Sequence, residues 1–125
     1  MNIPAQLLYS KDHEWVALDG DEATIGITDF AQGELGDIIF VEFPEPGTTF
    51  SQGEAFGTIE AVKTVSDLFL PLAGEITALN TSLEVAPEQV NADPYGKGWI
   101  VKMKASNLDE KQQLLDAAAY EAIIA

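Results

Sequence analysis

Hydrophobic and polar residues alternate in short runs over the first two thirds of the chain, as in half-buried β-strands. Glycine, proline and aspartate separate these runs at close intervals. The Asp19-Gly20-Asp21 sequence predicts a hairpin turn, because glycine accepts the positive φ of tight turns. The chain is therefore expected to be mainly β. The alternation predicts strands over residues 13–18, 23–27, 38–43, 75–79 and 99–103, and one long strand-like stretch over 55–70.

Two segments depart from the strand pattern. Residues 28–32 predict a short capped helical turn that ends at the glycines following it. Residues 107–124 predict a C-terminal amphipathic helix, because Asn107 and Glu110 have the spacing of a capping pair and hydrophobic residues follow at helical spacing. No linker or low-complexity segment interrupts the chain, so we expect a single domain over 1–125.

The charge balance excludes several classes of partner. Twenty-one acidic residues against six lysines give a net charge of -15, which opposes binding to nucleic acid and to anionic membrane surfaces. No apolar run approaches the length of a membrane span, and the first residues have neither the basic nor the apolar region of a signal or transit peptide. The sequence therefore predicts a cytoplasmic protein of bacterial type.

The residue inventory also excludes most catalytic and metal sites. There is no cysteine and His13 is the single histidine, so thiolate chemistry and clusters of Cys or His ligands are absent. Paired carboxylates among Asp19, Asp21 and Glu22 offer an acid/base or cation site, but they flank a turn and are better interpreted as solvated charges. We therefore expect no catalytic residue and no metal.

Lys63 lies in the middle of a long strand-like run, whereas the other five lysines lie in polar loops, at strand ends or on a helix surface. Its nearest basic neighbours in the sequence are Lys11 and Lys97. One interpretation is an exposed lysine on the solvent face of a strand. The other is covalent modification, because a lysine at a hairpin tip extends a flexible stem and acylation of its amine attaches a cofactor. Turn composition does not predict a tip here, since Gly, Asn, Asp and Pro are absent between Glu60 and Ser66, although a type I turn accepts the residues present.

Six groups of residues, in order along nearly the whole chain, match the pattern of one family. They are Tyr9 with His13-Glu14-Trp15, Gly26-Ile27-Thr28 with Ala31-Gln32, Leu35-Gly36-Asp37, Glu60-Ala61-Val62-Lys63 with Ser66-Asp67, Pro71 with Gly74-Glu75 and Asn80, and Val90-Asn91 with Asp93-Pro94-Tyr95 and Gly98-Trp99. Together they resemble the H protein of the glycine cleavage system. The family usually has Ser in place of Ala61 and Ala-Ala in place of Thr64-Val65.

The resemblance implies a lipoyl-type fold, a flattened barrel or sandwich of two antiparallel sheets (a barrel-sandwich hybrid) with short helical turns and a C-terminal α-helix. It implies a carrier that is not an enzyme, with lipoate in amide linkage to Lys63. Attachment would be the work of a lipoate ligase or octanoyltransferase. The resemblance places recognition by that enzyme on Glu60, Val62, Ser66 and Asp67.

The resemblance further implies that the lipoyl arm accepts an aminomethyl group from glycine decarboxylase (P protein). The aminomethyltransferase (T protein) receives this group, and dihydrolipoamide dehydrogenase (L protein) reoxidises the arm. Because the loaded arm is cationic, a cleft with a nearby carboxylate would protect it. Glu14 and Asp67 are the candidates for that carboxylate, with Asp12 as a third, and each is equally compatible with an ordinary exposed acid.

Other carriers fit the sequence less well. Biotin carriers have Met on both sides of the modified lysine, whereas Val62 and Thr64 flank it here. Lipoyl domains of 2-oxo-acid dehydrogenases lack the His13-Glu14-Trp15 start and the long C-terminal tail. An H-like protein that mainly stores lipoyl groups, or relays them to other lipoyl proteins, remains a second interpretation.

Overall fold

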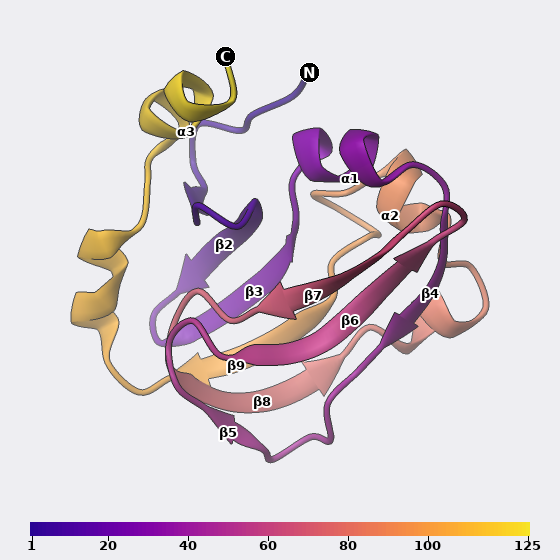
Figure 1. Ribbon diagram of the computed structural model, residues 1–125. Coiled ribbons are helices and arrows are strands. Elements are labelled where there is room, and N and C mark those ends of the chain that lie inside the picture. Colours follow the sequence, from indigo (N-terminus) through magenta and orange to yellow (C-terminus); the bar gives the residue numbers. More distant parts are fainter.

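The computed structural model describes all residues from 1 to 125 and contains two antiparallel sheets that pack face to face (Figure 1). The larger sheet has six strands, in the order β1 (Leu8–Tyr9), β2 (Glu14–Asp19), β3 (Glu22–Ile27), β9 (Val101–Ala105), β8 (Gly74–Leu79) and β5 (Thr49–Phe50). The smaller sheet has three, in the order β4 (Ile38–Glu42), β6 (Ala55–Ala61) and β7 (Val65–Phe69). The expected mainly β sandwich is confirmed, and the sheets do not close into one barrel.

Short helices connect and flank the strands. They are α1 (Asp29–Leu35), the 3-10 helix η1 (Thr81–Glu84), α2 (Gln89–Ala92), the 3-10 helix η2 (Leu108–Gln113) and α3 (Ala117–Ile124). The predicted helical turn is confirmed as α1, which runs past Gly33 and ends at Gly36. Thr28 caps it, because its side-chain oxygen accepts a hydrogen bond from the Ala31 amide. No helix is long and apolar enough to cross a membrane.

Two hairpins determine the arrangement of the sheets. The predicted β2–β3 hairpin is confirmed, with Gly20 at a φ of 63° in its turn. The strand-like stretch over 55–70 folds back on itself as the β6–β7 hairpin, whose strands pair from Glu60 with Val65 to Ala55 with Phe69. Lys63 therefore lies at the end of a hairpin and not within a strand.

Two hydrophobic clusters lie on opposite faces of the larger sheet. Nineteen buried residues from both sheets form the main core, and strand alternation directs Val16 into it. The neighbouring Trp15 points the other way and packs with Leu7, Tyr9 and Tyr120. Gly26 is opposite Trp15 in the sheet, and a methyl group added there would lie 2.6 Å from the indole ring, so glycine is required at this position.

The predicted continuous helix over 107–124 is wrong. Leu114 is extended, and Leu115 exchanges two backbone hydrogen bonds with Tyr9 of β1, at 2.7 and 2.8 Å. These bonds replace helical ones, and Asp116 then caps the separate helix α3. Glu110 accepts a hydrogen bond from the Ala73 amide instead of completing a capping box.

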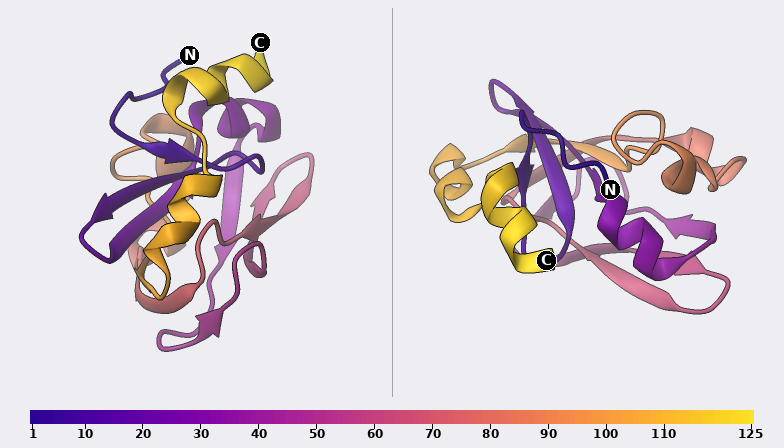
Figure 2. Two further views of the ribbon diagram at one scale, coloured as in Figure 1. Left: turned by 90° about the vertical axis from the view of Figure 1, so that its left-hand side faces the viewer. Right: turned by 90° about the horizontal axis from the view of Figure 1, so that it is seen from above.

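The ends of the chain and the β6–β7 hairpin occupy different parts of the molecule. Both termini lie at the same end, beside α3 and near α1, and the hairpin extends away from the rest of the fold (Figure 2). Lys63 is thus at the edge of the molecule, on the side toward which α1 ends.

Candidate functional site

The end of the β6–β7 hairpin exposes Lys63 and its neighbours. The Ala61 amide donates a hydrogen bond of 2.7 Å to the Thr64 carbonyl and closes the loop. Val62, Lys63 and Thr64 are all exposed. No residue of the loop has a positive φ, so the turn forms from residues that turn statistics do not favour.

The chain between α1 and β4 supports this tip. The Val62 amide donates a hydrogen bond of 3.0 Å to the Asp37 carbonyl. Gly36 has a φ of 84°, and a methyl group added there would lie 3.4 Å from Cε of Lys63. The lysine stem therefore passes over Gly36. Glycine is favoured there because of the positive φ, and its lack of a side chain leaves room for the stem.

Asn91 of α2 holds the support in place. Its side-chain amide donates to the Gly36 carbonyl and to the Gln32 side chain, each at 2.9 Å, and its carbonyl oxygen accepts from the Ile38 amide at 2.9 Å. One side chain thereby satisfies backbone groups on both sides of Asp37, whose carbonyl holds the tip. These hydrogen bonds explain why Asn91 is one of the residues that match the family pattern.

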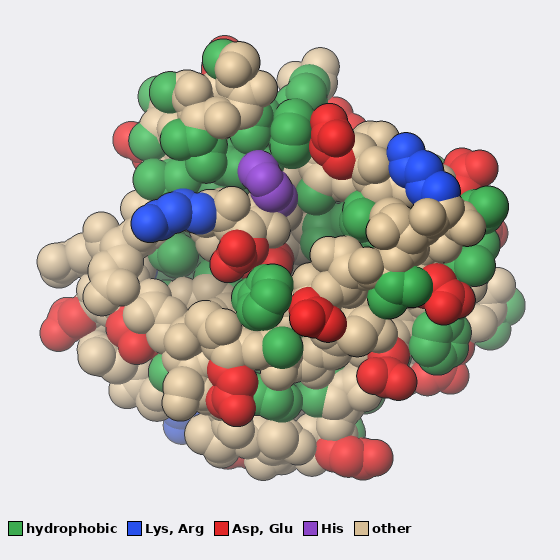
Figure 3. Space-filling view, viewed as in Figure 1, with side chains coloured by type: hydrophobic (Ala, Val, Ile, Leu, Met, Phe, Trp, Pro, Cys, Tyr) green, Lys and Arg blue, Asp and Glu red, His purple; other side chains and the backbone are tan.

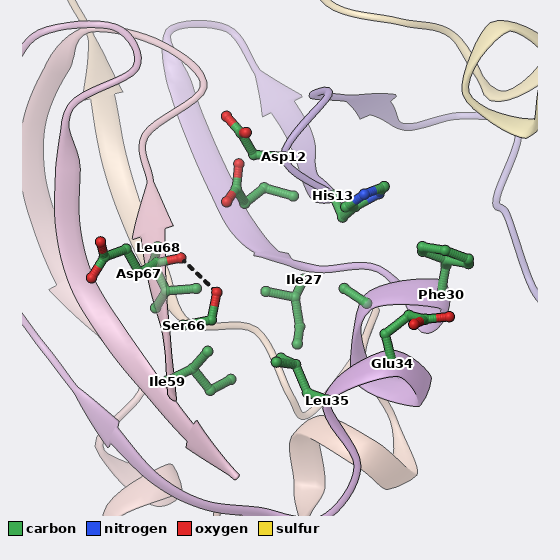
Figure 4. Close-up of a pocket in the computed structure, with 12 residues that line it drawn as sticks. Asp12, His13, Ile27, Phe30, Glu34, Leu35, Ile59, Ser66, Asp67 and Leu68 are labelled. Carbon is green, nitrogen blue, oxygen red and sulfur yellow. Dashed lines mark hydrogen bonds between the residues drawn. The ribbon is translucent and has the colours of Figure 1, made fainter. Parts of the chain in front are cut away.

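A cleft of about 270 Å³ lies between the β6–β7 hairpin and α1 (Figures 3 and 4). Its size is close to the lower end of small-molecule sites, about 300 Å³. Ile27, Phe30, Leu35, Ile59 and Leu68 provide much of its apolar lining, and Asp12, His13, Glu14, Ala31, Glu34, Ser66 and Asp67 complete it.

Glu14 is the buried acid of the cleft, with only 2% of its surface exposed. Its two carboxyl oxygens accept hydrogen bonds from the Ser10 hydroxyl at 2.7 Å and the Phe69 amide at 3.3 Å. Burial raises the pKa of Glu14 to about 8, although the hydrogen bonds from Ser10 and Phe69 act to lower it. The carboxyl group is consequently mostly protonated at neutral pH and would ionise beside a cation.

His13 forms part of the cleft wall in a constrained conformation. Its φ of 67° is the only positive value outside glycine. Its Nδ1 lies 2.8 Å from the Tyr120 hydroxyl, which is also 2.7 Å from the Thr28 hydroxyl. Burial raises the pKa of Tyr120 to about 12, so this hydroxyl keeps its proton. Sequence reasoning missed Tyr120, because nothing local links α3 to the start of β2.

The remaining predicted residues are distributed over both faces of β7. Ser66 points into the cleft, whereas the carboxylate of Asp67 points away from it (Figure 4). Alternation explains the difference, because Ser66 pairs with the buried Ile59 and Asp67 with Thr58. Asp12 is exposed at the rim, so Glu14 is the only candidate acid that is buried.

Glu60 and Val62 lie next to Lys63 on the hairpin, and Val62 is among the most exposed hydrophobic residues. Asp19, Asp21 and Glu22 are exposed at the β2–β3 turn, as their interpretation as solvated charges predicts. No group of three or more His, Asp or Glu side chains is arranged to hold a metal ion.

Comparison with known proteins gives concordant matches over almost the whole chain. The family described as "Glycine cleavage H-protein" matches residues 7–125. The chain is 56% identical to a glycine cleavage system H protein of Bacteroides thetaiotaomicron and 59% identical to one of Chlorobium luteolum, each time over 99% of this chain and 98% of the relative. A crystal structure of a glycine cleavage system H protein from Mycobacterium marinum is similar with a TM-score of 0.89, at 39% identity and 98% coverage of both chains.

Proposed function

The chain belongs to the glycine cleavage H-protein family, whose members carry lipoate for the glycine cleavage system, and we propose that it bears this group in amide linkage on Nζ of Lys63. The protein is a carrier of that system and not a catalyst. The observation that carries the proposal is the position of Lys63, exposed at the end of a projecting hairpin and next to a cleft. A relatively apolar arm attached there could extend into solvent or fold back.

Attachment requires only that the amine be accessible. The deprotonated Nζ would attack the acyl carbon of a lipoyl adenylate made by a lipoate ligase. The amide C–N bond forms as the acyl C–O bond to phosphate breaks, AMP leaves, and the amine proton passes to solvent. An octanoyltransferase would deliver its acyl group to the same atom. Glu60, Val62, Ser66 and Asp67 lie within four residues of Lys63 on the same hairpin and are the proposed recognition residues.

The cleft residues fit a folded arm. Leu35 and Ile59 offer apolar contact near the hairpin end, and Ile27 and Leu68 continue it along the cleft (Figure 4). Glu14 also lines the cleft and accepts a hydrogen bond from Phe69, at the far end of β7. When bound, the lipoyl group would supply a disulfide that can accept an aminomethyl group, and the dithiol that remains after this group is passed on would be the form that is reoxidised. Glu14 would then give up its proton and face the cationic end of the arm as a carboxylate. Asp12, exposed at the rim, would attract the same cation more weakly, and Asp67, whose carboxylate points away from the cleft, would contribute least.

The proposed partners follow from this role. They are glycine decarboxylase (P protein), aminomethyltransferase (T protein) and dihydrolipoamide dehydrogenase (L protein), together with the enzyme that attaches lipoate. Tethering the reacting group to Lys63 would raise its effective concentration at each successive active site. The bacterial relatives support the cytoplasm as the site of action.

The first prediction tests the attachment site. Intact-mass measurement of protein isolated from lipoate-supplied cells should show one lipoyl group per chain, and peptide mapping should place it on Lys63. Lys63→Arg should abolish the addition completely, because arginine keeps the charge and cannot form the amide. The exposed Lys111 on η2 offers the control Lys111→Arg, which should be modified like the wild type. Lipoate on Lys63→Arg, or biotin on the wild type, would contradict the proposal.

A further inference from the structure

Hydrophobic side chains are exposed on the outer face of the three-stranded sheet, next to Lys63. Ile39 and Phe40 of β4 are 48% and 51% exposed, and Val62 and Val65 of the hairpin are 72% and 59% exposed. The register aligns Phe40, Glu60 and Val65 in one row across the sheet. We call these four hydrophobic residues the outer apolar patch. It occupies the end of the sheet nearest the exposed amine.

A β-bulge creates this exposure. The pairing of β4 with β6 shifts between Ile38 and Phe40, so Ile39 and Phe40 both lie outside between the buried Ile38 and Val41. Regular alternation would have directed Phe40 toward the core. A large aromatic side chain turned into solvent adds nothing to the core, which suggests a binding role for the bulge.

The border of the patch is acidic. Asp37, Glu42 and Asp67 lie around it, and Glu60 lies within it, between Phe40 and Val65. Residues 37–69 contain no basic residue except Lys63. In the space-filling view, hydrophobic and acidic side chains alternate over β4, β6 and β7 (Figure 3). A second copy of the chain is therefore an unfavourable occupant, because two acidic borders would face each other.

We propose that the outer apolar patch is the docking surface for the enzyme that acylates Lys63, which would present an apolar socket bordered by Lys or Arg. The inference rests on the proposed attachment of lipoate to Lys63. The reacting atom in that step is Nζ itself, so the enzyme must approach within a side chain's length of the hairpin end. Enzymes that act on the far end of the arm have no such constraint. Docking on the outer face also leaves the cleft, on the inner face, uncovered.

Acylation kinetics of the unmodified protein test this assignment. The probe is a purified bacterial lipoate ligase with lipoate and ATP, and the readout is the rate of mass gain. Phe40→Ala should lower kcat/KM about tenfold or more, mainly through KM, because buried aromatic anchors dominate protein interfaces. Val65→Thr keeps the β-branched shape and should lower it severalfold. Raising NaCl from about 0.05 to about 0.5 M should raise the wild-type KM, because salt screens the acidic border.

Ile123 offers a matched control, since its side chain is also 51% exposed and its helix, α3, lies far from β4 and the hairpin end (Figure 1). Ile123→Ala should be acylated at the wild-type rate, and thermal melts should show that all variants are folded. Rates for Phe40→Ala and Val65→Thr within twofold of the wild type would overturn the inference and leave the attachment site intact. A defect confined to later reactions of the lipoylated protein would assign the patch to another partner and also overturn it. Absence of acylation on wild-type Lys63 would instead overturn the proposed function.

Discussion

Two ionisable side chains mark the two ends of the candidate site, and their environments are opposite. Lys63 is exposed at the hairpin tip, where its amine is accessible, whereas Glu14 is buried at the cleft and has a pKa raised to about 8. Lys63 could be identified as a candidate from the sequence, because it is a single lysine among acidic and apolar residues. The burial of Glu14, and the outward direction of Asp67, depend on strand register and could not be obtained from residue type alone.

The raised pKa of Glu14 predicts a specific dependence of stability on pH. The folded protein holds a proton that the unfolded chain releases above about pH 4.5, so this contribution to stability is complete below that pH and is lost as the pH rises toward 8. Between pH 5 and pH 8 the unfolding free energy of the wild type should fall by about 2–4 kcal/mol relative to Glu14→Gln. Denaturant unfolding across this pH range measures the difference.

Comparing slopes removes any constant cost of the Gln substitution. Glu22→Gln, at an exposed position in the β2–β3 hairpin, is the control and should leave the wild-type slope unchanged. Parallel curves for the wild type and Glu14→Gln would show that Glu14 is ionised in the folded protein.

Local patterns predicted the elements whose contacts are local. Alternation and the Asp19-Gly20-Asp21 turn identified the β2–β3 hairpin, and the cap at Thr28 identified α1. The two failures involve contacts between distant segments. The hairpin tip is held by the Asp37 carbonyl, and the C-terminal helix is broken because Leu115 pairs with Tyr9. The composition of the hairpin does not predict its bond to Asp37, and the composition of the C-terminal segment does not predict its pairing with Tyr9. The position of Lys63 at a hairpin tip was predicted from the resemblance to a known family.

Asn91 shows how far the tip depends on a distant element. Asn91→Ala would leave the Gly36 carbonyl and the Ile38 amide without their partner, and we expect it to lower the unfolding free energy by about 2–4 kcal/mol. Hydrogen exchange should also accelerate at the amide of Val62, which bonds to the neighbouring Asp37.

Glu88 begins the same helix with an exposed side chain that makes no capping hydrogen bond, so Glu88→Ala is the matched control and should change stability little. Unchanged exchange at Val62 in Asn91→Ala would mean that the tip is held by the hairpin alone.

The molecule as a whole is a small sandwich with a large excess of negative charge. Its two hydrophobic clusters use both faces of the larger sheet, which lets the N-terminal segment and α3 pack behind the core without adding to it. The acidic residues lie mainly at the surface, and the single buried acid among the cleft candidates has a raised pKa. The same surface charge that we expect to select basic partners must therefore oppose folding through self-repulsion.

A net charge of -15 on 125 residues predicts that added salt stabilises the fold. Raising NaCl from about 0.02 to about 0.5 M should increase the unfolding free energy by roughly 1–2 kcal/mol, because screening weakens repulsion more in the folded state, where the charges are closer. Lys104 pairs across the sheet with Glu22 on one side and Glu75 on the other, so Lys104→Gln should steepen the response. Asp19→Asn combined with Glu22→Gln removes two exposed acids and should flatten it. A stability that falls with salt in the wild type would mean that local attraction between opposite charges, such as that of Lys104 to the two acids opposite it in the sheet, outweighs the net repulsion.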